Sequence, residues 1–401
     1  WAAWTTKSRL NPTHNGAANW PLRFFCPALD NPGRGGYGQV MRQVVDQTTL
    51  AWGILATGRI AGSFARGVDR SQHGRLAAVG SRSRANAERF ARDFPGLRAH
   101  ASYEALLADP GVQAVYIATP HPQHVEWAVR AAAAGKHVLC EKPAGLTHAE
   151  MVIMAEAARA HSVLFMEAFM YRCHPQTTKI VEMVRDGLLG EIKLIQSAFG
   201  FNAPFDPGSR LWSNATAGGG ILDVGCYPVS MARLLAGATV GAPFLDPVEV
   251  SGAGQLHPET GVDLVAAATL RFPTGLVAQV AASLGVEQDN TLRIYGTHGM
   301  LRVPTPYNPA CGEEPAKFFL HRQGREEEIS IVTPGTLYAL EADAFAAAVA
   351  GGLREVPAMT LADSLGNMAT LDRWRAAIGL VYEQEKVGNP PAQTTVPSGD
   401  Q

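Results

Sequence analysis

The feature that most constrains this fold is the alternation, from residue 51 onward, of short apolar runs with alanine-rich stretches. The apolar runs have the length of β-strands and read WGIL, RLAAVG, AVYIATP, HVLCEKP and VLFMEAF. Helical spacing marks the stretches between them, at residues 59–68, 84–94, 123–135 and 147–160. Strands that alternate with helices over about 100 residues predict a parallel sheet with helices on both faces, a doubly wound α/β fold.

The alternation of strand-like and helix-like stretches ends after about residue 173. Short turns separate six further runs that predict an antiparallel or mixed sheet: IKLIQSAFGF, VEVSGAGQL, VDLVAAATLRF, LVAQVAASLG, NTLRIYGTHG and GMLRVP. Helices are predicted at residues 337–351 and 361–382. Because 401 residues are too many for one comfortable core, two domains are expected. We predict the doubly wound domain at residues 50–172 and a second α/β domain at residues 173–385.

Both ends of the chain differ from this pattern. Residues 1–49 are rich in Pro, Gly and Asn, have no sustained period and lack the charged start and apolar core of a secretory signal. Two interpretations stay open: a native arm that wraps a partner subunit, and a leader foreign to the native protein. Residues 386–401 are predicted to form a loose, Pro-rich tail.

Charge and cysteine usage exclude several classes of function. The 34 basic residues nearly balance 36 acidic ones, which argues against nucleic-acid or membrane-surface binding. No apolar run reaches the roughly 18 residues of a membrane span. The five cysteines are scattered without a CxxC pair, so neither a zinc site nor a disulfide framework is indicated. A cytoplasmic setting is expected, with the periplasm left open if residues 1–49 are a processed arm.

The turn after the first apolar run reads ATGRIA, residues 56–61. Small residues stand where the dinucleotide fingerprint requires them, although Ala56 replaces the first glycine. A helix that starts here offers free N–H groups to phosphate. We therefore predict a dinucleotide site at Ala56, Thr57, Gly58, Arg59 and Ile60, with an ordinary strand–helix turn as the alternative.

The segment SRSR follows the second apolar run, where an NAD enzyme usually has Asp or Glu for the ribose hydroxyls. The hydroxyl of Ser81 and the guanidinium groups of Arg82 and Arg84 suit a 2′-phosphate, because arginine binds it through two charge-assisted hydrogen bonds. The alternative is a solvated helix start capped by serine. The segment favours NADP over NAD.

Two more motifs supply groups for proton transfer. Glu141 and Lys142 follow an apolar run, at the sheet edge where ligands of open α/β folds bind. Asp223 and Tyr227 are four residues apart and would share one helix face. A free phenol has a pKa near ~10, and a nearby ammonium lowers it. We predict Tyr227 as acid/base, Lys142 as its electrostatic partner and Asp223 as orienting group and substrate contact. A capped helix with a satisfied tyrosine is the alternative.

Together, ATGRIA, AVYIATPHPQH, GKHVLCEKP, MYRCHPQ and GGGILDVGCYPV resemble motifs of the glucose–fructose oxidoreductase/inositol dehydrogenase (Gfo/Idh/MocA) family, over about residues 51–385. The resemblance implies an N-terminal Rossmann domain and a C-terminal α/β domain whose large open sheet is often used for dimerisation. It makes Lys142 the active-site lysine, before a cis Pro143. The pattern Asp223-x-x-x-Tyr227 is similar to the branch with glucose–fructose oxidoreductase, dimeric dihydrodiol dehydrogenase and NADP-dependent D-xylose dehydrogenase, which favours NADP.

The resemblance also implies further site residues. Near the cofactor it places Thr119, His121, His124, Glu141, Lys142 and Arg172. Near the substrate it places Tyr171, Arg210 and Trp212, with a core or interface role equally open for Trp212. No metal site is expected, since His121 and His124 alone would be too few ligands.

These observations predict an NADP-dependent oxidoreductase acting on an aldose, a sugar derivative or a cyclic diol. Its partners would be that small molecule and further copies of the chain, in a homodimer or homotetramer. One alternative is a sugar–sugar oxidoreductase of the glucose–fructose type that retains its NADP(H). An alternative of another class is a non-catalytic NADP-binding sensor, against which a complete Lys–Asp–Tyr set argues.

Overall fold

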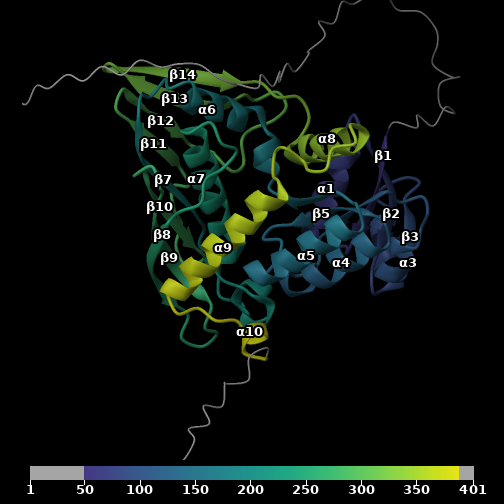
Figure 1. Cartoon of the computed structure of the whole chain (residues 1–401). Helices are drawn as coiled ribbons and strands as arrows, with labels where there is room; N and C mark the ends of the chain where they lie inside the picture. Colours follow the sequence, from purple (N-terminus) through teal and green to yellow (C-terminus); the bar gives the residue numbers. More distant parts are fainter. Residues whose placement is uncertain (1–48, 388–401) are drawn as a thin grey trace, which may run out of the picture. The chain divides into compact units, whose positions relative to one another are not determined.

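A computed structural model describes residues 49–387 of the chain. The predicted arm at residues 1–49 and tail at residues 386–401 therefore fall almost entirely outside the described residues. Two β-sheets with their helices make up the described fold (Figure 1).

The first sheet has six parallel strands in the order β3-β2-β1-β4-β5-β6, which is the Rossmann order. Its strands are β1 (Leu50–Leu55), β2 (Gly74–Gly80), β3 (Arg98–His100), β4 (Ala114–Ile117), β5 (His137–Glu141) and β6 (Phe165–Ala168). Every residue of β1 and β4 is buried, as expected for central strands covered on both faces. The predicted doubly wound fold is confirmed.

Helices connect these strands: α1 (Arg59–Val68), α2 (Arg84–Ala91), α3 (Tyr103–Leu107), α4 (His124–Ala133) and α5 (His148–Ala160). In α1 the apolar Ala61, Phe64 and Val68 recur at helical spacing and are buried. Side-chain oxygens that accept a backbone N–H bond cap the starts of α2, α3 and α5: Ser83, Ser102 and Thr147. Local sequence thus sets both where these helices begin and which face they bury.

The second sheet has eight strands in the order β14-β13-β12-β11-β7-β10-β9-β8. Only β7 and β10 pair in parallel, so the sheet is mixed and mostly antiparallel, as predicted. Its strands are β7 (Ile192–Gly200), β8 (Glu249–Leu256), β9 (Asp263–Arg271), β10 (Val277–Ser283), β11 (Leu292–Gly296), β12 (Gly299–Val303), β13 (Ala316–Arg322) and β14 (Arg325–Ile331). The later helices are α6 (Pro175–Arg185), α7 (Cys226–Ala238), α8 (Leu337–Ala350), α9 (Leu361–Ala377) and α10 (Glu383–Val387).

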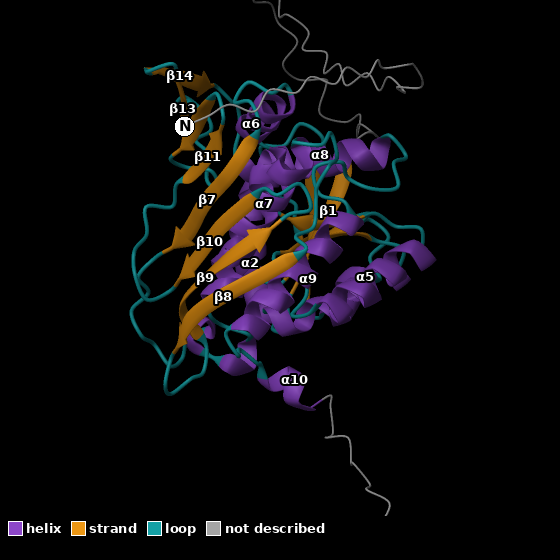
Figure 2. Ribbon diagram, turned by 60° about the vertical axis from the view of Figure 1, so that its left-hand side comes forward, coloured by secondary structure: helices purple, strands orange, loops and turns teal. Residues whose placement is uncertain are grey.

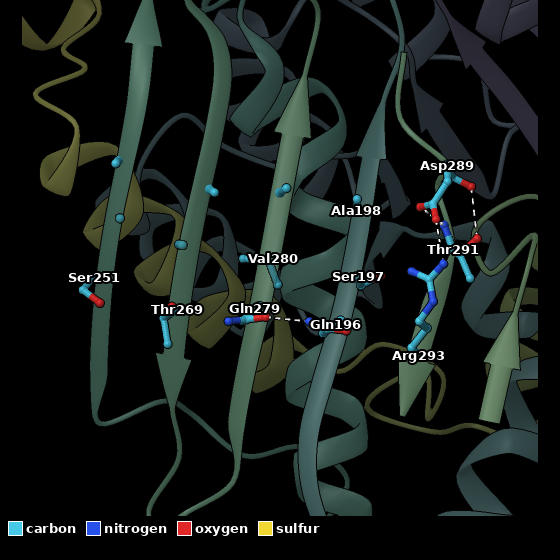
Figure 3. A pocket seen from close by; sticks show the side chains of 15 residues that line it. Gln196, Ser197, Ala198, Ser251, Thr269, Gln279, Val280, Asp289, Thr291 and Arg293 are labelled. Atoms are coloured by element: carbon cyan, nitrogen blue, oxygen red, sulfur yellow. Dashed lines mark hydrogen bonds and ion pairs between the residues drawn. The ribbon is translucent and has the colours of Figure 1, made fainter. Parts of the chain in front are cut away.

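One face of the second sheet packs on helices α7 and α9, and no helix among the described residues covers the other face, here called the open face (Figure 2). Along β9, buried Ala266 and Ala268 alternate with exposed Ala267 and Thr269, which is the two-residue period of a half-buried strand. The open face carries small and polar side chains around a hollow of about 650 Å³. Figure 3 shows Gln279 joined to a glutamine of the neighbouring strand on this face.

Helices from the end of the chain return to the first sheet. The ring of Phe345 in α8 lies 5.2 Å from that of Trp52 in β1. In α9, Asp372 accepts a hydrogen bond from the backbone N–H of His148 at the start of α5, at 2.8 Å. The domain boundary between residues 172 and 173 stays a prediction, because helices that follow it in the chain also pack against the first sheet and its helices.

Helix α9 ends earlier than the sequence predicts, at Ala377 instead of residue 382. Gly379 adopts a left-handed φ of +70°, which no helix continues through. One described helical stretch, Asn214–Ala238, is long and apolar enough to cross a membrane. Because 94% of its apolar part is buried inside the protein, its apolar side chains belong to the hydrophobic core.

Candidate active site

A cavity of about 870 Å³ opens at the carboxyl ends of β1, β2, β4 and β5. This is the edge at which open α/β sheets bind ligands. Most predicted site residues line it: Ala56, Thr57, Gly58, Arg59, Ile60, Ser81, Arg82, Thr119, His121, His124, Glu141, Lys142, Arg210, Asp223 and Tyr227. The fold therefore brings together residues that lie more than a hundred positions apart in sequence.

The turn after β1 lies along one wall of the cavity. Ala56 adopts a left-handed φ of +84°, the conformation for which the fingerprint uses glycine. Gly58 precedes the first turn of α1 with a φ of −72°, and no atom lies within 4 Å of the position its Cβ would take. The open space above Gly58 and the free N–H groups of α1 form a cradle that fits a pyrophosphate.

In the SRSR segment, some residues are placed to bind a phosphate and others belong to the start of a helix. Ser81 and Arg82 line the cavity, and Ser83 both lines it and caps α2 through a hydrogen bond from the N–H of Asn86, at 3.3 Å. Arg84 does not line the cavity: its guanidinium is exposed and pairs with Glu88 at 2.8 Å. The prediction of Arg84 as a cofactor contact is corrected, because helix α2 turns that side chain into solvent.

Two histidines follow β4 at the cavity wall. His124 is fixed by hydrogen bonds to the carbonyl groups of Thr119, at 2.8 Å, and Pro143, at 3.0 Å. Burial lowers the pKa of His121 well below its usual value, and the nearby His124 acts in the same direction. His121 is therefore neutral, and in the described structure its Nδ1 atom and the Thr119 hydroxyl are buried without partners. Both orphaned atoms are available to a ligand.

Lys142 stands at the end of β5, and its peptide bond to Pro143 is cis, as the resemblance implied. Glu141 accepts hydrogen bonds from the Tyr116 hydroxyl and, at 3.2 Å, from the backbone N–H of Lys142. Burial raises the pKa of Glu141, and the charge of Lys142 opposes this rise. The carboxyl group thus fixes the backbone of the lysine from within the sheet.

Lys142 and Asp223 are in contact. The Nζ atom of Lys142 donates to the backbone carbonyl of Asp223 at 2.8 Å, and the Asp223 carboxylate accepts from Arg210 at 2.8 Å. Burial raises the pKa of Asp223, but the charges of Lys142 and Arg210 outweigh burial, so the net pKa is lowered. Asp223 therefore remains ionised.

Asp223 lies in a π-helical turn, Ile221–Gly225, that leads into α7, where Tyr227 is found. Such turns are rare and occur frequently at functional sites. The Lys142 Nζ atom lies 5.1 Å from the centre of the Tyr227 ring. Four aromatic side chains surround that ring: Phe169, Tyr171, Phe199 and Tyr307.

The net pKa of Tyr227 is raised in this structure, although Lys142 lies near its ring. Burial raises the pKa of Tyr227 well above its usual value, and the negative charge of Glu141 raises it further. The ammonium group donates to the Asp223 carbonyl, while the Tyr227 hydroxyl contacts the Met170 sulfur at 3.8 Å. The phenol is therefore neutral in the free protein.

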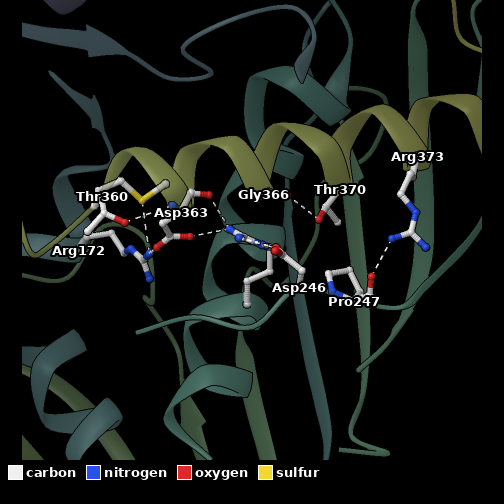
Figure 4. A network of polar contacts seen from close by, with 10 residues as sticks. Arg172, Asp246, Pro247, Thr360, Asp363, Gly366, Thr370 and Arg373 are labelled. Atoms are coloured by element: carbon white, nitrogen blue, oxygen red, sulfur yellow. Dashed lines mark hydrogen bonds and ion pairs between the residues drawn. The ribbon is translucent and has the colours of Figure 1, made fainter. Parts of the chain in front are cut away.

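Arg172 is predicted near the cofactor, but the structure places it in a buried ion network (Figure 4). Its guanidinium pairs with Asp363 of α9, which also binds Arg233 of α7 at 2.5 Å. Arg172 does not line the cavity. This prediction is corrected, because the buried carboxylate draws the guanidinium away from the cavity.

Neither Tyr171 nor Trp212 lines the cavity, unlike Arg210. The Tyr171 hydroxyl donates to Ser230 at 2.9 Å, inside the core. The Trp212 indole donates to the Pro204 carbonyl at 3.0 Å and is buried. For Trp212 the structure agrees with the alternative of a core role. The prediction that Tyr171 contacts the substrate is corrected, because its side chain is buried in the core.

Several lining residues were missed by sequence reasoning. Ser63, Ser83, Asn86, Tyr103, Ala118 and Pro120 belong to the first sheet's loops and helices, whereas Met170, Asn308 and Tyr338 come from more distant segments. Tyr103 is hydrogen-bonded to Arg82. The only available signal was a tyrosine at a helix start after a short strand, which is weak. Asn308 and Tyr338 reach the cavity through long-range packing, which no local pattern reveals.

The donor set fits a dinucleotide and offers no metal centre. The cradle at Gly58, the orphaned groups of Thr119 and His121, and the cationic Arg82 match the phosphates and polar atoms of such a molecule. Across residues 49–387 no group of three or more His, Cys, Asp or Glu side chains could hold a metal ion.

A Rossmann sheet whose cavity joins a dinucleotide cradle to buried proton-transfer groups defines an oxidoreductase. Family models agree: one described as "Oxidoreductase family, NAD-binding Rossmann fold" matches residues 50–169, and one described as "GFO/IDH/MocA C-terminal domain" matches residues 177–302. The chain belongs to the Gfo/Idh/MocA family of oxidoreductases.

Known relatives and solved structures are similar over most of the chain. A trans-1,2-dihydrobenzene-1,2-diol dehydrogenase of Mus musculus is 34% identical, over 84% of this chain and 99% of its own. The Homo sapiens protein of that name is 32% identical, with the same coverage. A 3-ketoreductase from Actinomadura kijaniata, solved with NADP and TDP-benzene, has a TM-score of 0.74 and 27% identity, over 82% of this chain and 98% of that chain.

Proposed function

We propose that this protein is an NADP-dependent oxidoreductase that transfers a hydride between nicotinamide and a hydroxyl-bearing carbon of an aldose, a sugar derivative or a cyclic diol. The observation that carries this proposal is one cavity, which joins the turn at residues 56–60 to Lys142, Asp223 and Tyr227. The names of the diol dehydrogenases support the diol, and the NADP complex of the ketoreductase supports the cofactor.

Distinct residues would hold the two ends of NADP. Gly58 and the first N–H groups of α1 would bind the pyrophosphate, and Ser81 with Arg82 would bind the 2′-phosphate. His121 and Thr119 would face the nicotinamide end. When bound, the nicotinamide supplies hydride transfer at its C4 atom.

Tyr227 would exchange the proton that accompanies the hydride. Because burial keeps its phenol neutral, the free protein holds Tyr227 in the form that donates a proton to a forming alkoxide, which suits reduction of a carbonyl. Oxidation requires the phenolate, and Lys142 is the cation near enough to stabilise it. The ionised Asp223 would accept a hydrogen bond from a substrate hydroxyl.

Nucleotide analysis of the purified protein tests the proposal first. Stoichiometric NADP(H) released on denaturation would favour the sugar–sugar oxidoreductase with retained cofactor. An empty protein that binds NADPH more tightly than NADH would support an exchanging dehydrogenase, and the reverse preference would contradict our assignment of Arg82.

Turnover of Tyr227→Phe separates the enzyme from a non-catalytic sensor. We expect it to abolish turnover of aldoses and diols while NADPH binding persists. The control is Tyr295→Phe, because Tyr295 lies in β11 outside the cavity. Unchanged turnover in Tyr227→Phe would remove Tyr227 from the mechanism.

We also propose that the protein self-associates through the open face of the second sheet, as a homodimer or homotetramer. Its small, exposed side chains would let a second sheet approach closely. A cytoplasmic location completes the proposal, supported by the free thiols of Cys140, Cys173, Cys226 and Cys311.

A further inference from the structure

Asp263, the first residue of β9, lies outside the cavity and is fully buried. Its carboxylate is directed at the three glycines that precede the π-helical turn, Gly218–Gly220, here called the glycine segment. The Oδ2 atom accepts the backbone N–H of Ile221 at 2.7 Å, and the N–H of Gly220 also donates to the carboxylate. A strand of the second sheet thus caps the start of the turn that carries Asp223.

The glycine segment is fitted against this carboxylate. Gly219 has a left-handed φ of +108°, and a side chain there would overlap the Asp263 carboxylate. Its N–H donates to the Leu211 carbonyl at 3.0 Å, within the loop that carries Arg210. On the neighbouring glycine, the Gly218 carbonyl accepts from the Tyr382 hydroxyl at 2.9 Å. The glycine segment is therefore contacted by three separate parts of the chain, those that carry Asp263, Leu211 and Tyr382.

The glycine segment positions Asp223, one of the proposed catalytic groups. The N–H of Asp223 donates to the Gly219 carbonyl at 3.3 Å. The same Asp223 receives Lys142 on its carbonyl and Arg210 on its carboxylate, both at 2.8 Å. A shift of the glycine segment would therefore move the contacts of both cations.

We infer that Asp263 is a positioning residue, whose buried carboxylate fixes the glycine segment and thereby sets the place of Asp223 between Lys142 and Arg210. This inference rests on the proposed function only where it concerns turnover. The contacts of Asp263 themselves do not depend on which substrate is used.

The charge state of Asp263 agrees with a role other than stability. Burial raises the pKa of Asp263 to about 6, although the backbone N–H groups of Ile221, Asp263 itself and Gly220 and the charge of Arg375 oppose the rise. Within the described residues its Oδ1 atom has no hydrogen-bond partner. An incompletely paired buried carboxylate destabilises a fold, and such groups are kept mostly at functional sites.

The test compares Asp263→Ala with Asp263→Asn in the full-length protein. We expect Asp263→Ala to lower kcat by about 10²-fold, because a catalytic group displaced by about 1 Å loses that much. NADPH affinity should stay unchanged, since the cofactor cradle is elsewhere. Asp263→Asn keeps an oxygen for the Ile221 N–H and should retain kcat within about tenfold of wild type.

Hydrogen exchange supplies a readout that does not need turnover. In Asp263→Ala, amides of residues 218–223 should lose protection, and in Asp263→Asn they should keep it. Asp109→Ala is the control, because Asp109 also accepts a backbone N–H bond, that of Gly111 at 2.8 Å, in a partly buried position that does not line the cavity. The control should lose stability and keep both kcat and the protection of residues 218–223.

Wild-type kcat and protection in Asp263→Ala would overturn the inference, as would losses no larger than those of Asp109→Ala. If the wild-type protein turns over no sugar or diol with NADP, the proposed function fails. Exchange alone then decides the inference, and unchanged protection overturns it.

Discussion

At the scale of single residues, Ala56 and Gly58 show that two small side chains in one turn answer different demands. Ala56 holds a left-handed φ of +84°, which costs an L-residue about 1 kcal/mol. Gly58 has an ordinary φ of −72°, so its value lies in the space that it leaves open. The backbone conformation is therefore what matters at Ala56, and the absence of a side chain is what matters at Gly58.

Gly58→Ala should therefore weaken NADPH binding without unfolding the protein. A methyl group in the cradle would overpack the approaching pyrophosphate and reduce affinity by about tenfold or more. Fluorescence titration with NADPH measures the change, with urea unfolding as the check on stability. Gly285→Ala is the control, since the nearest atom to its added Cβ would be 3.5 Å away and outside the cavity. Unchanged affinity in Gly58→Ala would contradict our placement of the phosphates.

Arg210→Gln should change the pH dependence of turnover. Arg210 helps to lower the pKa of Asp223, so its removal raises that pKa. Because Asp223 is needed ionised, the acidic limb of the kcat/KM profile should move to higher pH, with activity lost earlier as the pH falls. Arg130→Gln, which removes an exposed guanidinium on α4, should leave the profile in place. An unmoved acidic limb in Arg210→Gln would argue against an ionised Asp223 in catalysis.

Sequence could predict most of the candidate site because of one geometric fact. Residues that directly follow parallel strands meet at one edge of the sheet, so Gly58, Arg82, His121 and Lys142 could be placed together without a structure. Arg172 could not be placed, because a buried guanidinium is drawn by whichever carboxylate the tertiary fold supplies. That carboxylate, Asp363, lies 191 positions away.

At the scale of elements, a buried ion network ties α9 to α7 and to the segment after β6. Arg172 and Arg233 are nearly inaccessible to solvent, and Asp363 lies between them. Asp246 joins Arg233 at 2.6 Å from the surface side. Since two buried cations share one buried carboxylate, Asp363 is the critical member.

Asp363→Ala should lower the free energy of unfolding by about 3–5 kcal/mol, because it leaves the buried guanidinium of Arg172 without a carboxylate and leaves Arg233 with only the half-exposed Asp246. Urea denaturation measures this loss. Asp246→Ala should cost about 1 kcal/mol or less, since its side chain is half exposed and Arg233 keeps Asp363. Equal losses in the two variants would refute a network centred on Asp363.

Helix α6 and the hairpin of β13 and β14 were missed in the sequence for different physical reasons. Helix α6 has clear local signals, with Pro175 at its first position and Gly187 beyond its end, but it lies in the connection between the two sheets, after β6 and before β7. The hairpin of β13 and β14 turns at Gln323 and Gly324, both with positive φ, where Gln-Gly is a weaker signal than Asn-Gly. Charged side chains on β14 further masked the period of the strand.

At the scale of the whole molecule, the open face of the second sheet is the surface that our proposed self-association needs. Thr269→Arg would place a long cation on that face at an exposed position. We expect a smaller assembly in sedimentation, because like charges would meet across a symmetric contact. Thr178→Arg, at an exposed position of α6, is the control. The same mass for Thr269→Arg and wild type would direct the contact to another surface.

The return of α8 and α9 to the first sheet has a consequence for synthesis on the ribosome. Trp52 emerges early, yet its neighbour Phe345 is made almost 300 residues later. Until then the nascent first sheet lacks part of its apolar cover, and such long-range contacts form slowly. The nascent chain should therefore depend on chaperones during most of its translation. When a ribosome is stalled before residue 337, the first sheet of the nascent chain should still be cut by a protease.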